Sequence, residues 1–137
     1  MGWEVYPDGL YEVLGRLRAE YEVPPLYVTE NGAAYPDRLE RGRVDDPART
    51  SFLERHIAAV ARAIADGVDV RGYFLWSLLD NFEWAYGYAQ RFGIVHVDFE
   101  SLERTPKASF RWYRDLIAAE RASTTRPAEE DSRAAAG

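Results

Sequence analysis

The chain has 137 residues, the usual length of one domain, and 47% of them are hydrophobic. This composition is typical of a folded globular protein and argues against a disordered chain. A net charge of −6 offers no basic surface for nucleic acid or anionic lipid. The sequence has no cysteine, and its two histidines, His56 and His96, lack the spacing of metal ligands. We therefore expect no disulfide, no metal and no other cofactor.

No apolar run approaches the roughly 20 residues that a membrane span needs. The opening residues, Met1-Gly2-Trp3-Glu4, lack the basic and apolar blocks of a signal peptide. We therefore expect no membrane partner and a cytoplasmic location.

The first predicted helix begins at Pro7, a residue that the first turn of a helix tolerates well. Its apolar residues recur at helical spacing, at Leu10, Val13, Leu14, Leu17 and Tyr21. Pro24 and Pro25 end this helix, and residues 26–29 then predict a short buried strand. Residues 33–45 are polar and rich in turn formers, which indicates a loop.

A second helix is expected from Asp46 and Pro47 to a stop at Gly67. Its apolar face would consist of Leu53, Ile57, Val60 and Ile64. Residues 70–76 predict a second strand, which a long aromatic segment follows over residues 77–99.

Thr105 and Pro106 are expected to open a third helix. Its apolar face would consist of Phe110, Tyr113, Leu116 and Ile117. From about residue 120 the composition turns to Ala, Arg, Ser, Thr, Glu and Pro. We therefore expect a folded domain over residues 1–119 and a disordered tail over residues 120–137.

Two strands separated by a helix indicate parallel βα units in an α/β protein. Two strands do not make a finished fold, because a parallel sheet is normally buried on both faces and leaves no free edge. On physical grounds the chain is expected to be a piece of a larger α/β protein, with apolar faces and edges that favour self-association.

Glu30 follows the first strand directly, in the motif Thr29-Glu30-Asn31-Gly32. In a parallel barrel the carboxyl ends of the strands carry the catalytic groups. An Asn-Gly pair also suits a hairpin turn, in which Glu30 would be an ordinary exposed acid. The residues after Gly32 do not read as a returning strand, but the pattern alone leaves both interpretations open.

A second motif, from Trp76 to Trp84, stands at the exit of the second strand. Indole faces beside carboxylates suit sugars, because the rings pack against C–H groups and a carboxylate accepts from hydroxyl groups. A lone tryptophan is more often a core residue. Two tryptophans that flank Asp80, Asn81 and Glu83 would be harder to bury, because the polar side chains would need partners.

These two motifs, together with Arg91-Phe92-Gly93, resemble those of family 1 glycoside hydrolases, and the resemblance runs from Gly2 to about Ile117. It implies the C-terminal part of a (β/α)8 TIM barrel, comprising the sixth helix, strands seven and eight, and their helices. The expected activity is that of a retaining β-glucosidase.

The resemblance also implies roles for six residues. Glu30 would be the nucleophile, and Trp76 the platform under the sugar ring that is cleaved off. Glu83 would accept from the 4- and 6-hydroxyls, and Trp84 would donate to the 3-hydroxyl. Phe92 would wall the pocket near the 6-hydroxyl, and Trp3 would lie on the aglycone side. Asp80 and Asn81 are expected to shape the loop.

Glu83 favours a neutral glycone such as glucose, fucose or galactose. The 6-phosphoglycosidase branch of the family usually has a small hydroxyl residue at this position, since a carboxylate would repel the phosphate.

The general acid/base of the family belongs to an Asn-Glu-Pro motif, which this sequence lacks. Two interpretations remain. The chain is a β-glucosidase fragment that is inactive alone and needs the missing N-terminal barrel segment, or it is a non-catalytic carbohydrate-binding remnant.

Overall fold

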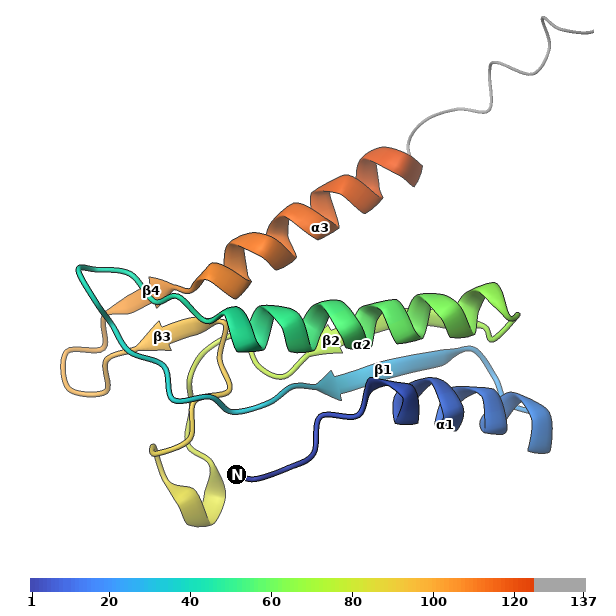
Figure 1. Cartoon of the computed structure of the whole chain (residues 1–137), viewed down its shortest axis with the longest axis horizontal. Coiled ribbons are helices and arrows are strands. Elements are labelled where there is room, and N and C mark those ends of the chain that lie inside the picture. The colour runs from blue at the N-terminus through green and yellow to red at the C-terminus, as the bar shows by residue number, and fades with distance from the viewer. Residues whose placement is uncertain (125–137) are drawn as a thin grey trace, which may run out of the picture.

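The computed structural model describes residues 1–124 and consists of two small sheets and three α-helices (Figure 1). The elements in chain order are α1 (Pro7–Glu20), β1 (Leu26–Asn31), α2 (Pro47–Ala65), β2 (Val70–Leu75), the 3-10 helix η1 (Trp84–Tyr86), β3 (Val95–Val97), β4 (Arg104–Pro106) and α3 (Ala108–Thr124). The predicted order of helix, strand, helix, strand, long loop and helix is confirmed for the three helices and the first two strands, but the predicted loop contains η1, β3 and β4.

The two predicted strands pair in parallel, with Leu26 opposite Val70 and Val28 opposite Tyr73. A hairpin turn at Asn31 and Gly32 would pair β1 with an antiparallel strand. Because β1 instead pairs in parallel with β2, the hairpin alternative is wrong. The sheet packs on α1 and α2 through a core in which Leu14, Val60, Ala63 and Val68 are buried.

Three residues of the predicted apolar faces are exposed instead of buried. Val13 is 54% exposed, Tyr21 63% and Ile64 48%. Tyr21 lies beyond the end of α1, as a C-cap residue with extended backbone angles. Val13 lies at the margin of the stripe that Leu10, Leu14 and Leu17 form. The spacing of apolar residues therefore identified the buried face of α1 correctly but assigned too many residues to it.

The start of the third helix was also predicted wrongly. Thr105 pairs with His96 in a short antiparallel hairpin of β3 and β4, and α3 begins only at Ala108. At its start, the backbone N–H of Ala108 donates to the carbonyl of Val44. Residues 104–106 are extended because they pair with β3.

Helix α3 continues through Thr124, into the segment that was predicted to be a tail from residue 120. The remainder of that predicted tail lies outside the described residues.

Among the described residues, β1 and β2 form a sheet of their own, without a third strand. The helices cover one face of this sheet, and on the other face Tyr27 and Phe74 are each 58% exposed. No closed barrel is formed within residues 1–124. None of the helices in this part of the chain is long and apolar enough to cross a membrane.

Candidate active site

One pocket of about 260 Å³ lies at the carboxyl ends of β1 and β2, and we call it the tryptophan pocket. Its lining residues are Trp3, Glu30, Gly32, Trp76, Glu83, Trp84 and Phe92. All six residues to which the sequence analysis gave a role at the sugar site therefore lie around one cavity. They come from three separate parts of the chain, namely the N-terminal segment, the end of β1 and the segment that follows β2.

Glu30 lies in an irregularity of the sheet. Between the pairs Val28–Tyr73 and Asn31–Leu75, β1 has two residues where β2 has one, which makes a β-bulge at Thr29 and Glu30. Bulges locally re-aim side chains and are common next to active sites. Glu30 is exposed and lines the tryptophan pocket.

The next two residues of the motif fix the end of β1 against β2. The side-chain oxygen of Asn31 accepts a hydrogen bond of 2.7 Å from the Tyr73 hydroxyl, and its carbonyl accepts from the Trp76 backbone N–H at 3.0 Å. A Cβ atom on Gly32 would lie 1.7 Å from the Trp76 carbonyl oxygen, so only glycine fits. The motif therefore sets the position of Glu30 relative to Trp76.

The segment after β2 folds back on itself, so that residues 92–94 lie beside Ser77. The backbone N–H of Ser77 donates to the carbonyl of Phe92, and the N–H of Ile94 donates to the carbonyl of Ser77. These bonds place Phe92 beside Trp76, although the two residues are 16 positions apart (92 − 76). Phe92 is only 3% exposed, and its ring centroid lies 6.1 Å from that of Trp3.

Glu83 and Trp84 lie at the outer turn of this segment. The backbone N–H of Glu83 donates to the carbonyl of Gly87 at 2.7 Å, and Trp84 has a left-handed φ of 40°. Trp84 is 85% exposed and Trp76 is 38% exposed. Neither tryptophan is therefore buried in the core of the described chain.

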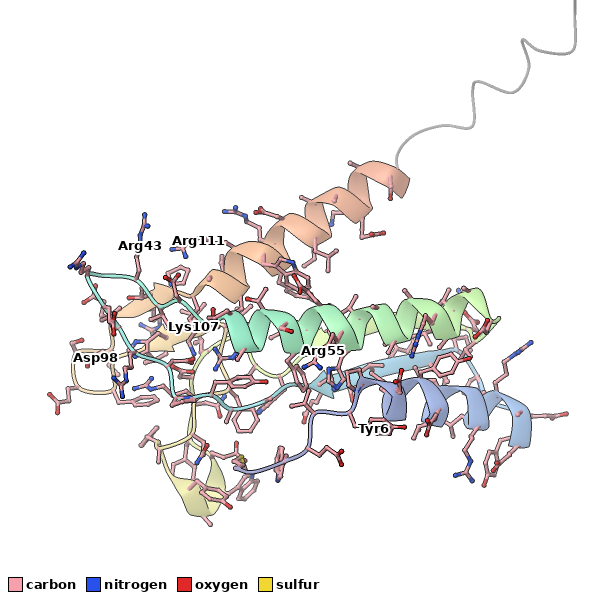
Figure 2. All side chains as sticks on the ribbon, viewed as in Figure 1. Tyr6, Arg43, Arg55, Asp98, Lys107 and Arg111 are labelled. Atoms are coloured by element: carbon pink, nitrogen blue, oxygen red, sulfur yellow. The ribbon has the colours of Figure 1, made fainter. Side chains whose placement is uncertain are left out.

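A buried cluster of charges that the sequence analysis missed lies next to the pocket. Its carboxylates belong to Asp37, Asp46 and Asp80, and its cations to Arg49, Arg91 and Lys107. Three negative charges face three positive ones, so the cluster is neutral as a whole. Figure 2 places Lys107 near the first turn of α2, just before the start of α3.

Asp80 connects this cluster to the pocket wall. Its carboxylate accepts from Lys107 at 2.8 Å, from Arg91 at 2.6 Å and from the backbone N–H of Gly93 at 3.0 Å. The amide of Asn81 donates to the Ser77 hydroxyl at 2.8 Å. The expectation that Asp80 and Asn81 shape the loop is supported by these contacts. No local sequence signal reveals the cluster, because it joins residues as far apart as Asp37, Asp80 and Lys107.

The lining of the tryptophan pocket combines two carboxylates with three indole rings and contains no cationic side chain. Carboxylates accept from hydroxyl groups, and aromatic faces pack against apolar ring hydrogens. The two like charges disfavour an anionic ligand. The arrangement suits a neutral, hydroxyl-rich ring such as a sugar.

Comparison with known proteins identifies the class. Residues 1–122 match Glycosyl hydrolase family 1. A bifunctional β-D-glucosidase/β-D-fucosidase from Bifidobacterium breve is 57% identical in an alignment of 123 positions that covers 86% of this chain and 27% of that protein. A 6-phospho-β-galactosidase from Streptococcus equi subsp. zooepidemicus is 46% identical over 117 residues, covering 85% of this chain and 25% of that protein.

The structure of a psychrophilic β-glucosidase from Micrococcus antarcticus matches with a TM-score of 0.85 and 59% identity, over 86% of this chain and 26% of that one. The chain belongs to glycosyl hydrolase family 1 and has the fold of part of its TIM barrel. It spans about a quarter of the length of the relatives that it matches.

Proposed function

We propose that the chain carries the nucleophile side of the active site of a retaining β-glucosidase. The observation that carries the proposal is the tryptophan pocket, in which Glu30 and Glu83 lie among three indole rings. Bifidobacterium and Micrococcus relatives named as β-glucosidases, at 57% and 59% identity, support the same activity.

In the proposed reaction a carboxylate oxygen of Glu30 attacks the anomeric carbon of a β-glucoside. The bond from this carbon to the aglycone oxygen breaks, and that oxygen takes a proton from an acid. A water molecule, deprotonated by the same group, then hydrolyses the glycosyl ester and releases Glu30. Two displacements retain the β configuration of the sugar.

The remaining residues of the pocket would hold the sugar. Trp76 lies under the ring, and the exposed Trp84 offers its indole N–H to the 3-hydroxyl. Glu83 accepts from the 4- and 6-hydroxyls. Phe92 closes the side near the 6-hydroxyl, and Trp3 contacts the aglycone. The neighbouring positions of these side chains around one pocket support this division of roles.

The acid/base must come from a segment that this sequence does not contain, because it has no Asn-Glu-Pro motif. General acid–base catalysis contributes about 10²–10⁴-fold to the rate of such reactions. We therefore propose that the chain alone does not turn over aryl β-glucosides. Turnover by the purified chain that Glu30→Gln abolishes would contradict this part of the proposal.

The role of Glu30 is tested in a complete barrel, in which the chain is joined to the part of the Micrococcus antarcticus β-glucosidase that lies outside the match. Glu30→Gly should abolish hydrolysis but leave glycoside binding nearly unchanged, because the binding side chains are intact. Azide or formate should restore turnover by occupying the space of the lost carboxylate. Only one displacement then remains, so the product should have the α configuration.

Glu83→Ser is the matched control, because it removes the other carboxylate of the pocket. It should keep measurable hydrolysis and gain nothing from azide. If azide rescued Glu83→Ser rather than Glu30→Gly, the two roles would be reversed. If the complete barrel bound glycosides but hydrolysed none, the alternative of a carbohydrate-binding remnant would replace the proposal.

A further inference from the structure

A separate polar cavity lies in the segment between β1 and α2, and we call it the arginine pocket. It has a volume of about 490 Å³, and its lining residues are Pro36, Arg38, Glu40, Arg41, Arg43 and Asp45. It shares no lining residue with the tryptophan pocket. The chain as a whole has a net charge of −6, so three arginines around one cavity are a local exception. The arginine pocket is therefore a candidate site for an anion.

A tight hairpin presents the charged side chains of this pocket. Glu40 and Arg43 exchange two backbone hydrogen bonds of 2.8 and 3.0 Å. The two residues between them, Arg41 and Gly42, have left-handed φ angles of 50° and 74°. A turn of this kind normally takes Asn, Asp or Gly at its first central position, so an arginine there costs stability. Val44 anchors the base of the hairpin, because its side chain is fully buried.

The charges of the arginine pocket are unpaired within the described part of the chain. Its three arginines are exposed, and their side chains have no hydrogen bond, ion pair or ring contact within residues 1–124. Apart from Arg111, each of the other arginines in this range interacts with another group. Glu40 and Asp45 are also exposed and form no ion pair with these arginines. Charges of both signs are therefore free to contact a ligand.

Arg111 extends the positive charge from the pocket onto α3. The backbone N–H of Ala108 donates to the carbonyl of Val44 at 3.0 Å, so the first turn of α3 lies against the base of the hairpin. Arg111 follows Ala108 by about one helical turn. Figure 2 shows Arg43 and Arg111 on the same side of the molecule. The arginines that have no partner within residues 1–124 are therefore gathered in one region.

This combination of charges defines the class of ligand. A guanidinium group can donate two parallel hydrogen bonds to a phosphate, so the three arginines suit a phosphate group. The carboxylates of Glu40 and Asp45 accept from hydroxyl groups, and they repel further anionic groups. This repulsion disfavours a polyanion such as a nucleic acid, whose phosphates follow one another closely. The volume of the cavity lies in the range of small-molecule sites.

We propose that the arginine pocket binds a phosphorylated sugar or polyol. The phosphate contacts the guanidinium groups of the pocket, and the hydroxyl groups donate to Glu40 and Asp45. Arg111 lies outside the lining and contributes by electrostatic attraction alone. Because the site is separate from the tryptophan pocket, binding here requires neither Glu30 nor the hydrolysis of a glycoside.

The test is isothermal titration calorimetry of the full 137-residue chain with ribose 5-phosphate, in a buffer without other polyvalent anions. We expect one site with a Kd of about 1 mM or lower. Arg43→Gln should weaken binding by about tenfold or more, because it removes charge-assisted hydrogen bonds to the phosphate. Arg16→Gln is the matched control and should change nothing, since Arg16 is an exposed arginine of α1 outside the pocket.

Two further variants separate the contributions to binding. Arg43→Lys keeps the positive charge but loses the planar donor pair, so its affinity should lie between those of the unmodified chain and Arg43→Gln. Glu40→Gln removes one repelling carboxylate. It should therefore strengthen the binding of inorganic phosphate and reduce the preference for ribose 5-phosphate over inorganic phosphate.

Absence of binding, or binding that Arg43→Gln and Arg16→Gln weaken equally, would overturn the proposal. Equal affinity for inorganic phosphate and ribose 5-phosphate would also overturn it, because the pocket would then hold an adventitious ion only. Trp84→Ala, in the tryptophan pocket, should leave the affinity unchanged. If Trp84→Ala abolished binding, the ligand would occupy the tryptophan pocket and the proposed site would be wrong.

Discussion

Lys107 donates from Nζ to Oδ1 of Asp80 across 2.8 Å, and neither side chain is exposed to solvent. The same ammonium group also donates to Asp37 and to the carbonyl of Gly93. One cation therefore joins the segment after β1, the segment after β2 and the start of α3. The first two of these segments also carry residues of the tryptophan pocket.

Replacement of this cation should destabilise the fold strongly. Lys107→Met leaves two buried carboxylates, on Asp37 and Asp80, with fewer compensating charges, and breaking a buried ion pair typically costs about 3–5 kcal/mol. Arg49 and Arg91 still contact these carboxylates, which favours the lower part of that range. The measurement is the urea midpoint of the chain, with unfolding monitored by tryptophan fluorescence.

Arg16→Met provides the control for this prediction. Arg16 pairs with Glu20 on the surface of α1, where the two side chains are 73% and 46% exposed. Such a pair contributes less than about 0.5 kcal/mol. Equal shifts of the urea midpoint in both variants would show that the buried cluster is not held together by Lys107.

Gly32→Ala should disrupt the pocket, whereas Gly15→Ala should not. The added Cβ at position 32 would meet the Trp76 carbonyl oxygen at 1.7 Å, so the ends of β1 and β2 must separate. Gly15 lies within α1 with no atom within 4 Å of its added Cβ, and alanine there should stabilise the helix by about 0.5–1 kcal/mol. Urea midpoints measure both effects, and a neutral Gly32→Ala would contradict the close approach.

The helices and the parallel pair of strands could be predicted because their signals are local. Apolar residues at helical spacing identified α1 and α2, and Pro24 and Pro25 marked the interval between α1 and β1. The tryptophan pocket could be anticipated because its motifs stand directly after the two strands. Parallel strands bring such positions to the same edge of a sheet.

Features that depend on contacts between distant residues left no such pattern. The bulge at Glu30 depends on the register of β1 against β2, which is set by the partner strand. The buried cluster joins Asp37, Asp80 and Lys107, which lie 43 and 27 positions apart (80 − 37 and 107 − 80). Thr105 and Pro106 resemble a helix start locally, but the pairing with β3 decides their structure.

The stability of the chain should fall as the pH is lowered from about 7.5, where unfolded histidines begin to bind protons. Burial lowers the pKa of both His56 and His96 from the ordinary value of 6.5, and nearby Arg55 and Arg91 act in the same direction. Below pH 6.5 the unfolded chain binds protons that the folded chain does not, so the free energy of unfolding decreases. Well above this pH, near pH 8, the histidines are neutral in both states and the effect vanishes.

Urea midpoints between pH 5.5 and about 8 measure this dependence. A double variant, His56→Gln with His96→Gln, should show a flatter profile in the same interval. An unchanged profile in the double variant would assign the pH dependence to other groups.

Glu83→Ser should separate binding of a neutral glycone from tolerance of a phosphorylated one. In the proposed site the carboxylate accepts from two hydroxyls, and each lost charge-assisted bond should weaken a neutral glucoside by about 1.5–3 kcal/mol. The same carboxylate would repel a phosphate on the 6-position by about 4 kcal/mol at 4 Å and an effective dielectric constant of about 20. Serine removes this repulsion, so the variant should lose kcat/KM on a neutral aryl β-glucoside and gain it on the 6-phosphate.

The measurement uses the complete barrel and compares the two substrates at low ionic strength, where the electrostatic contribution is largest. Glu54→Ser is the control, because Glu54 is an exposed residue of α2 outside the pocket and its replacement should change neither rate. The relatives of the chain include a β-D-glucosidase/β-D-fucosidase and a 6-phospho-β-galactosidase, so enzymes named for both kinds of glycone are similar to this chain. If Glu83→Ser lowered kcat/KM equally on the neutral glucoside and on the 6-phosphate, Glu83 would position Trp84 and would not discriminate between neutral and charged sugars.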